Sequence, residues 1–390
     1  FEYPEGWLDP GIDPLANQHL QCLETIKLAA DQLDLGFPTR NSMRSADFAP
    51  RIAPSNALLI AVHTVGIAGN VVRLKESYLP GYYYFDRTGY SGWSEIAFNQ
   101  DLQNFAVNCA AEGNAEFLKR LREEKLSSNS SKYAQNYTAV NNRSPSKPYV
   151  FLALQTTDDF VARLAYIDQL QLASLLAEKA REQSMQLLVK RHPRCMDTQV
   201  ECYINRLASD YSCVSLTDES VNVLISDATA VATVNSGVGF EALLLGVPVI
   251  TAGRSDYSFV TNQLKSVNDL KHLEFVDNSS RSSAVENFLC YYLNDYCLHN
   301  ADIEKAKGML KKWRSDHYSY MYDILNGNCT LLDEIQLYIV ELENMRRCSL
   351  LKNNEIRPVE SINNDTCSVK GVWGRIIDVV QRMTGCTHSE

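Results

Sequence analysis

Small residues link an apolar run to an expected helix at residues 234–241, where Ser236, Gly237 and Gly239 stand at the helix start. Free N–H groups and the helix dipole at such a start attract anions, so the segment suits a phosphate or a carboxylate. Glu241, about one turn further on, can accept hydrogen bonds from ribose hydroxyls. The alternative is a tight turn in which Ser236 only caps the helix. The run lacks a G-x-G-x-x-G pattern, which argues against NAD.

Basic residues follow a second apolar run. Lys190, Arg191 and His192 precede Pro193, which stops the strand expected there. Two cations and an imidazole at a strand end suit a phosphate or a sugar carboxylate. A solvated basic turn is the alternative. Because the two motifs end different strands of one predicted sheet, we expect them to act together.

Two adjacent carboxylates, Asp158 and Asp159, follow a third apolar run. A carboxylate in a cleft can act as a nucleophile or as an acid or base. Successive residues point in different directions, so we expect one of the two to face a ligand. The other interpretation is that one of them caps the next helix. Neither belongs to a recognisable set of metal ligands.

Residues 86–95 combine aromatic, glycine and acidic positions. Tyr90 and Trp93 suit stacking against a sugar ring, and Glu95 or Asp86 suits a base that acts on a hydroxyl. The alternative places Trp93 in the core and Glu95 in the first turn of a helix.

The second half of the chain predicts the scaffold for these motifs, because apolar runs alternate with amphipathic helical segments. The predicted strands are 149–154, 186–190, 213–216, 230–234 and 248–251, and the predicted helices are 167–184, 196–208, 220–226 and 239–245. This alternation predicts a doubly wound α/β domain that binds ligands at the carboxyl ends of its strands.

The first half predicts another α/β domain, followed by a Ser- and Asn-rich linker. Its predicted elements are a helix at 17–33, strands at 56–62 and 82–85, a helical region at 96–125 and the linker at 127–147. We therefore expect an N-terminal α/β domain at 1–147, a C-terminal α/β domain at 148–350 that ends in helices from 301 to 347, and a tail at 351–390. An apolar-periodic piece at 372–383 suits a helix on the protein's own body or on a membrane surface. Two such domains place a ligand in the cleft between them.

Composition narrows the function classes. The 390 residues are 45% hydrophobic, and 37 basic against 47 acidic residues give a net charge of −10, which argues against a nucleic-acid partner. Eleven cysteines without a CxxC pair predict reduced thiols and no metal site. No run approaches the ~20 apolar residues that span a bilayer, and no signal-peptide pattern opens the chain. These features predict a cytoplasmic protein.

Three motifs share the order and spacing of a known family. Gln155-x-x-x-Asp159, Lys190 to Pro193, and Asn235 to Leu243 with Gly246-x-Pro248-Val249-Ile250 resemble the β-Kdo transferases of capsular polysaccharide and O-antigen synthesis. The resemblance covers roughly residues 150–255, and the His-Pro and Ser motifs are also similar to those of bacterial sialyltransferases. It implies a GT-B-like pair of Rossmann-type domains with a helical C-terminal segment. It further implies transfer of Kdo from CMP-β-Kdo to a bacterial glycan acceptor, with retention and without a metal or a bound cofactor.

The resemblance also assigns roles. The family's carboxylate falls on Asp159 rather than Asp158 and would attack the anomeric carbon of Kdo. His192 and the helix start at Ser236, Gly237 and Gly239 would hold the leaving phosphate. Of the other residues, Lys190 or Arg191 would pair with the phosphate or the Kdo carboxylate, Glu241 would hold the cytidine ribose, and Glu95 would be the general base. The N-terminal domain would take the acceptor.

Work at the inner face of a bacterial inner membrane and further catalytic modules of the same polypeptide are additional expectations from the resemblance. Two alternatives stay open. One is another nucleotide-sugar transferase or an epimerase on the same fold. The other is a glycan-binding module without catalysis.

Overall fold

The computed structural model describes residues 1–42, 57–66, 70–129, 131, 148–275 and 283–313. Residues 1–52 and 59–322 form one compact unit, which contains both β-sheets, and residues 53–58 with 323–390 form a second. The predicted tail at 351–390, the apolar piece at 372–383 and most of the linker at 127–147 lie outside the described residues. The predicted domain boundaries therefore stay predictions.

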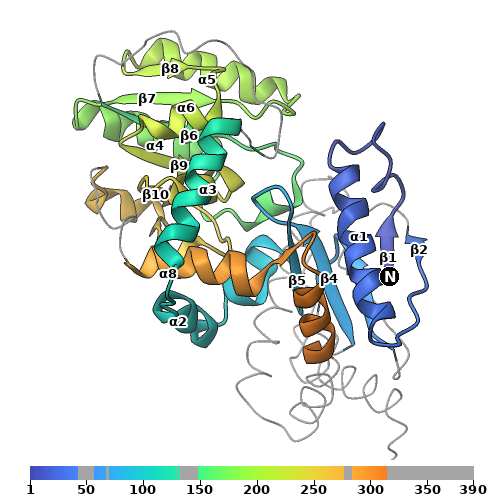
Figure 1. Ribbon diagram of the computed structural model, residues 1–390. Helices are drawn as coiled ribbons and strands as arrows, with labels where there is room; N and C mark the ends of the chain where they lie inside the picture. Colours follow the sequence, from blue (N-terminus) through green and yellow to red (C-terminus); the bar gives the residue numbers. More distant parts are fainter. Residues whose placement is uncertain (43–56, 67–69, 130, 132–147, 276–282, 314–390) are drawn as a thin grey trace, which may run out of the picture. The chain divides into compact units, whose positions relative to one another are not determined.

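The second sheet confirms the doubly wound domain. Its six strands are all parallel and run in the order β11-β10-β9-β6-β7-β8, much of which can be followed in Figure 1. The strands are β6 (Tyr149–Ala153), β7 (Gln186–Lys190), β8 (Val214–Leu216), β9 (Ala230–Thr233), β10 (Val249–Thr251) and β11 (Asn262–Gln263). Numbered along the chain, this is the 3-2-1-4-5-6 order of dinucleotide-binding folds, in which β6 and β9 flank the point where the strand order reverses.

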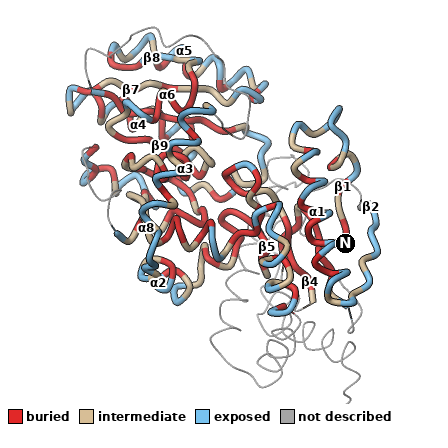
Figure 2. Tube along the Cα trace, viewed as in Figure 1, coloured by how far each residue is buried: buried red, intermediate tan, exposed pale blue. Residues whose placement is uncertain are grey.

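Helices connect these strands where the sequence predicts them. They are α4 (Gln169–Glu182), α5 (Thr198–Asp210), α6 (Val221–Ser226) and α7 (Gly237–Leu244). Asp168 and Asp197 begin α4 and α5 as N-caps, since their side chains accept hydrogen bonds from the first-turn N–H groups of Leu170 and Gln199. Every residue of β6 and β9 is buried, and Figure 2 shows buried trace along the strands of the sheet. Burial on both faces explains why these strands are continuous apolar runs.

The first sheet is mixed, with the order β12-β5-β4-β3-β1-β2. Its strands are β1 (Glu2–Pro4), β2 (Arg40–Ser42), β3 (Leu59–Val62), β4 (Val71–Glu76), β5 (Tyr82–Asp86) and β12 (Leu298–His299), and α1 spans Ala16–Asp31. The strands from β2 to β4 are parallel, whereas β5 is antiparallel to β4. Gly81, at φ 84°, makes the turn that leads back into β5. The two sheets confirm the predicted GT-B-like α/β class.

The helical region predicted at 96–125 is two helices, α2 (Gln100–Asn108) and α3 (Asn114–Ser128). Gly113 separates them because it adopts φ 89°, a left-handed conformation that ends regular helix. α3 packs near α7 of the second sheet, where Arg122 Nε donates to the carbonyl of Leu244 at 2.6 Å.

The chain past the second sheet returns to the first. It forms α8 (Ser283–Tyr291), a π-helical turn (Tyr292–Tyr296) and then β12, which pairs with β5. Residues 303–313 are helical, in agreement with the predicted C-terminal helices, and the rest of that prediction lies outside the described residues. Within the described ranges, no helix has the length and apolar character needed to cross a bilayer.

Candidate active site

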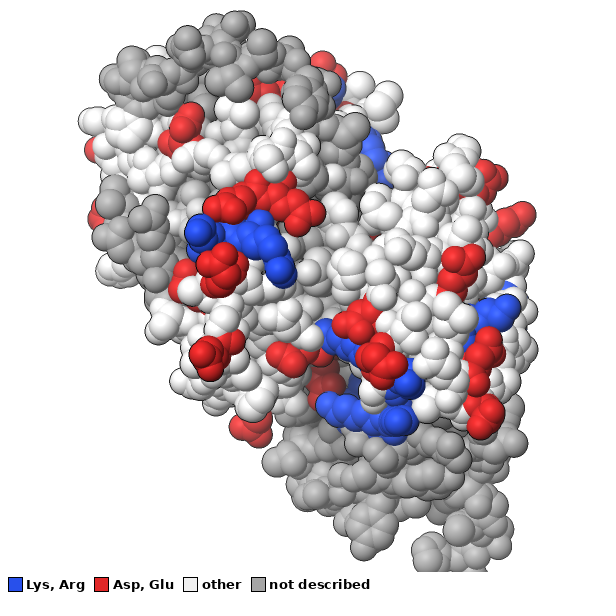
Figure 3. Space-filling view, in the orientation of Figure 1, with Lys and Arg blue, Asp and Glu red and all other residues white. Residues whose placement is uncertain are grey.

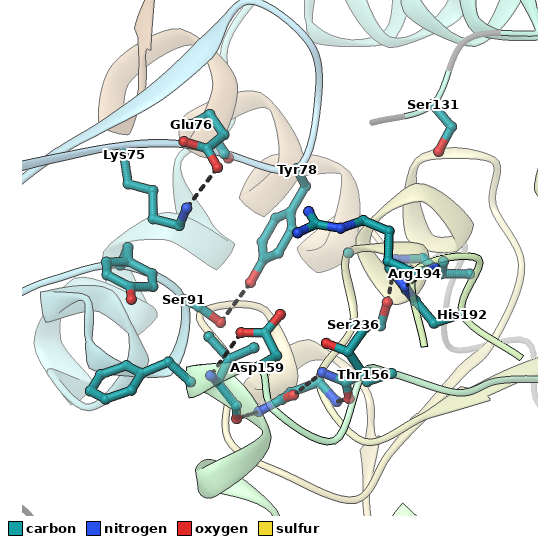
Figure 4. A pocket seen from close by; sticks show the side chains of 18 of the residues that line it. Lys75, Glu76, Tyr78, Ser91, Ser131, Thr156, Asp159, His192, Arg194 and Ser236 are labelled. Carbon is teal, nitrogen blue, oxygen red and sulfur yellow. Dashed lines mark hydrogen bonds and ion pairs between the residues drawn. The ribbon is translucent and has the colours of Figure 1, made fainter. Parts of the chain in front are cut away.

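A cavity of about 890 Å³ lies at the carboxyl ends of β6, β7 and β9 and is also lined by residues of the first sheet. Figure 4 shows Asp159, His192, Arg194 and Ser236 in this lining, with Lys75, Glu76 and Tyr78 from the other sheet. Its volume is that of a site for a small molecule the size of a nucleotide sugar. The sheet therefore places the cavity where its strand order predicts a ligand.

Two buried amides fix the loops at the reversal point. Gln155 follows β6 and is 6% exposed, and Asn235 follows β9 and is 1% exposed. Gln155 Nε2 donates to Asn235 Oδ1 at 2.8 Å, and the Asn235 N–H donates to Gln155 Oε1 at 3.1 Å. Asn235 Nδ2 also donates to the carbonyl of Val161 at 2.8 Å. These bonds join the loop that carries Asp159 to the start of α7.

Asp158 and Asp159 both line the cavity and are exposed to it. One Asp159 oxygen, Oδ1, accepts a hydrogen bond from the Val161 N–H at 3.1 Å and caps the short helix Phe160–Leu164. The capping interpretation therefore holds for Asp159, and it fixes one carboxylate oxygen. Asp159 can cap this helix and still contact a ligand in the cavity, because a carboxylate has two oxygens and the cap uses only one of them.

The basic motif at the end of β7 lines the same cavity. Burial lowers the pKa of the Lys190 ammonium, against the opposing effect of the Asp218 and Glu219 carboxylates. Arg191 Nη1 lies 2.9 Å from Glu201 Oε2 of α5.

His192 accepts a hydrogen bond at Nδ1 from the Arg194 N–H at 3.2 Å. The neutral ring then carries its proton on Nε2 and can donate from there. Sequence reasoning missed Arg194, which also lines the cavity. Its position two residues after His192 could have indicated that it belongs to the site.

The start of α7 lines the cavity through Ser236 and Gly237. Ser236 is the N-cap, and its Oγ accepts from the Val238 N–H at 3.4 Å. Gly237 allows close packing, since a Cβ there would lie 3.0 Å from Tyr78 Cδ1. The capping alternative and an anion site both fit this geometry.

Gly239 is not among the cavity-lining residues. A Cβ on it would stand 2.5 Å from the hydroxyl of Tyr257, a buried residue that donates to the carbonyl of Ser236 at 2.5 Å. Glycine is needed here so that Tyr257 can reach the helix start, and not for approach of a ligand.

We expect Gly239→Ala to lower the free energy of unfolding by about 1–3 kcal/mol, because the new methyl group must displace a buried tyrosine. Gly308→Ala is the matched control. Gly308 lies in the helical residues 303–313, and a Cβ there meets nothing within 4 Å, so alanine should be neutral or stabilise by up to about 1 kcal/mol. Denaturant titration measures both, and equal stability of the two variants would contradict the packing argument.

Glu241 lines the cavity, but its carboxylate has protein partners. Its Oε2 lies 3.3 Å from Lys125 Nζ of α3, and its Oε1 accepts from Ser131 Oγ at 2.9 Å. Both side chains of the ion pair are almost fully buried. A ribose hydroxyl bound by Glu241 would have to share it with Lys125.

The segment 86–95 divides into different roles. Tyr90 lines the cavity, whereas Trp93 is 0% exposed and packs against Phe160 with ring centroids 4.7 Å apart. Asp86 is buried and accepts hydrogen bonds from the N–H groups of Thr88 and Gly89, so it holds this loop. The alternative reading of Trp93 as a core residue holds.

Glu95 stands in the first turn of the short helix Glu95–Ala97, and its Oε2 lies 3.8 Å from Arg87 Nε. It is not among the residues that line the cavity. The geometry therefore gives the predicted role of Glu95 as general base no support.

Sequence reasoning missed the contribution of β4 and the loop after it. Lys75, Glu76 and Tyr78 line the cavity from this side. Lys75 Nζ lies 2.6 Å from Glu76 Oε1 and 5.3 Å from the centre of the Tyr90 ring.

A buried carboxylate, Asp256, joins the two sheets beneath the cavity. It accepts hydrogen bonds from the hydroxyls of Tyr78 at 2.5 Å, Tyr84 at 2.6 Å and Tyr292 at 2.8 Å. Burial raises the pKa of Asp256 to about 6, although the three hydroxyls act in the opposite direction. Because Tyr78 packs on Gly237, Asp256 connects the first sheet to the start of α7.

The fold is that of a GT-B-like α/β protein, with a cavity at the reversal point of its second sheet that basic side chains and the start of α7 line. A family model described as capsule polysaccharide biosynthesis protein matches residues 108–285, which include the whole second sheet.

Protein FixF of Sinorhizobium fredii (strain NBRC 101917 / NGR234) is 31% identical over 149 residues, which are 35% of this chain and 36% of FixF. The chain thus matches about a third of the length of this curated relative.

Two solved structures from Thermosulfurimonas dismutans KpsC are also similar. The β-Kdo 2,4 transferase is 18% identical with a TM-score of 0.44, over 71% of this chain and 89% of that one. The β-Kdo 2,7 transferase is 14% identical with a TM-score of 0.44, over 80% of this chain and 99% of that one.

Proposed function

We propose that this chain is a glycosyltransferase of bacterial capsule-type glycan synthesis that transfers Kdo from CMP-β-Kdo to a glycan acceptor with retention of configuration. One observation carries the proposal. A carboxylate, Asp159, a lysine, Lys190, and a helix start, Ser236, line one cavity at the reversal point of a sheet inside the segment that matches the capsule biosynthesis family.

The donor's anionic groups fit the second-sheet side of this cavity. The start of α7 supplies N–H groups and the positive end of its dipole to the CMP phosphate, and Ser236 adds a hydroxyl. His192 and Lys190 also face the developing phosphate charge, and Arg191 or Arg194 adjoins the Kdo carboxylate. Glu241, which lines the cavity and pairs with Lys125, binds the cytidine ribose in this proposal.

The chemistry takes two displacements. In the first, an Asp159 oxygen bonds to C2 of Kdo while the C2–O bond to the CMP phosphate breaks, and CMP leaves with the electron pair. In the second, the acceptor oxygen bonds to C2, the bond to Asp159 breaks and the hydroxyl proton passes to a base. Two inversions at C2 give net retention, and a nearby carboxylate stabilises the oxocarbenium-like transition states.

Thermal unfolding with CMP, CDP, UMP, UDP, GDP and ADP tests the donor class. A ligand at ~100 times its dissociation constant adds about 2.7 kcal/mol, which raises the melting temperature by several degrees. We expect CMP to raise the melting temperature, and Lys190→Gln to make this increase smaller. Lys271→Gln is the control and should leave the increase unchanged, because Lys271 is exposed and outside the cavity lining.

If UDP or GDP raises the melting temperature and CMP does not, the proposed Kdo transfer is wrong, and another nucleotide-sugar transferase or an epimerase is favoured. Absence of any shift, together with no CMP release from CMP-Kdo, would favour the glycan-binding alternative.

A further inference from the structure

The first-sheet wall of the cavity is acidic. Among the described lining residues, it carries three carboxylates, Glu5, Asp13 and Glu76, against one lysine, Lys75, and the imidazole of His63. Lys75 is only 15% exposed and forms its ion pair with Glu76 at 2.6 Å. The positive charge of Lys75 is therefore already compensated, and the wall presents net negative charge to the cavity.

Among the described lining residues, the other lysine and the arginines lie on the second-sheet wall, which also carries the carboxylates of Asp158, Asp159 and Glu241. Lys190, Arg191 and Arg194 line it, together with His192. Arg191 is paired with Glu201 at 2.9 Å. The proposed donor brings two anionic groups, its phosphate and its sugar carboxylate, so this wall's cations match the donor's charges.

On the face drawn in Figure 3, acidic and basic side chains are interspersed. Inside the cavity charges interact more strongly than at such an open surface.

We propose that the first-sheet wall selects an acceptor ring that carries hydroxyls and no carboxylate, that is, a neutral sugar. The inference rests on the proposed function. Carboxylates accept hydrogen bonds from sugar hydroxyls. On this wall an acceptor carboxylate would lose water beside Glu5, Asp13 and Glu76, and the charge of the lysine there, Lys75, is already compensated by Glu76. Repulsion between these carboxylates and a carboxylate on the acceptor therefore disfavours binding of acidic sugars.

Glu5 offers a clean way to change the charge of this wall. It follows β1 in a turn that backbone bonds hold, with the Trp7 N–H donating to the carbonyl of Pro4 at 3.2 Å and the Asp9 N–H to that of Gly6 at 3.1 Å. The Glu5 side chain is exposed. Asp13 is less suitable, because its carboxylate also accepts a hydrogen bond from the Leu15 N–H just before α1 and pairs with His19.

The experiment compares transfer from CMP-Kdo, made in situ, to two sets of aryl glycosides. Each neutral hexoside has a matched uronide that differs only by a carboxylate in place of the CH₂OH group. We expect kcat/KM to be at least about tenfold higher for the neutral member. Glu5→Lys should reduce this ratio at least about threefold, whereas Glu112→Lys should not, since Glu112 is exposed and outside the cavity lining.

Three results would overturn the inference: a uronide used as well as its neutral partner, no neutral ring accepted at all, or a ratio that Glu5→Lys leaves unchanged. CMP release from the donor without acceptor, measured in the same samples, separates the two hypotheses. If CMP is released while acceptor selection fails, only the inference is wrong. If CMP-Kdo is not consumed under any condition, the proposed function is wrong as well.

Discussion

Asp159→Asn is expected to lower the rate of Kdo transfer by at least about 10³-fold while folding and CMP binding stay close to wild type. Asparagine is as good a helix cap as aspartate, so its side-chain oxygen can still accept the Val161 N–H that Asp159 Oδ1 accepts at 3.1 Å. An amide oxygen cannot form the covalent adduct at C2. The measurement is single-turnover transfer from CMP-Kdo, with the melting temperature and its CMP shift recorded on the same protein.

Asp158→Asn is the matched control, because Asp158 is the adjacent carboxylate and lines the same cavity. If Asp159 is the nucleophile, loss of the Asp158 charge should change the rate by about tenfold or less. Wild-type turnover in Asp159→Asn would rule out Asp159 as the nucleophile. Comparable losses in both variants would indicate a general effect of charge and not covalent catalysis.

The second sheet was predictable because its signals are local. Buried parallel strands are continuous apolar runs, as in Tyr149–Ala153 and Ala230–Thr233, and polar caps such as Asp168 and Asp197 begin the helices between them. The strand ends then put Asp159, Lys190 and Ser236 at one edge. Their presence in one cavity follows from topology alone.

The first-sheet side of the site was not predictable in the same way. β4 (Val71–Glu76) mixes apolar with charged residues, because it ends in Lys75 and Glu76 at the cavity. Neither periodicity nor a turn signal separates it from a loop. Glu95 was chosen for its chemistry, but the carboxylates of this wall are Glu5, Asp13 and Glu76, which distant parts of the chain supply.

The contacts of Asp256 were also not predictable from the sequence. Its three tyrosine partners, Tyr78, Tyr84 and Tyr292, lie 178, 172 and 36 residues away in the sequence. No local pattern marks such a cluster. The cluster affects the position of the candidate site, because Tyr78 packs against Gly237 and the neighbouring Tyr257 donates a hydrogen bond to the carbonyl of Ser236. The α7 helix start is thus held in place by long-range contacts.

We expect Asp256→Ala to lower the free energy of unfolding by about 2–4 kcal/mol. The buried Tyr84 hydroxyl loses its acceptor, the hydroxyls of Tyr78 and Tyr292 are left with Ser91 and Ser77, and an unsatisfied buried group costs about 1–3 kcal/mol. Asp210→Ala is the control, since Asp210 is an exposed residue that pairs with Arg206 one helical turn away and should change stability by about 0.5 kcal/mol or less. Denaturant titration at pH 7 measures both variants. A loss for Asp256→Ala no larger than that of the control would contradict the assigned role.

The pH dependence of stability gives this prediction its second test. The pKa of Asp256 is about 6 in the folded protein against an ordinary value of 3.8. Between these pH values the folded state holds a proton that the unfolded state has released, so the free energy of unfolding falls as pH rises from about 4 to about 6. The carboxylate's share of this fall is about 3 kcal/mol.

Asp256→Asn keeps polar partners for the tyrosines and removes the ionisation, so its stability should decline less over the same range. Parallel titrations at pH 4, 5, 6 and 7 measure the difference between the two proteins, and identical slopes would mean that Asp256 does not titrate in this window.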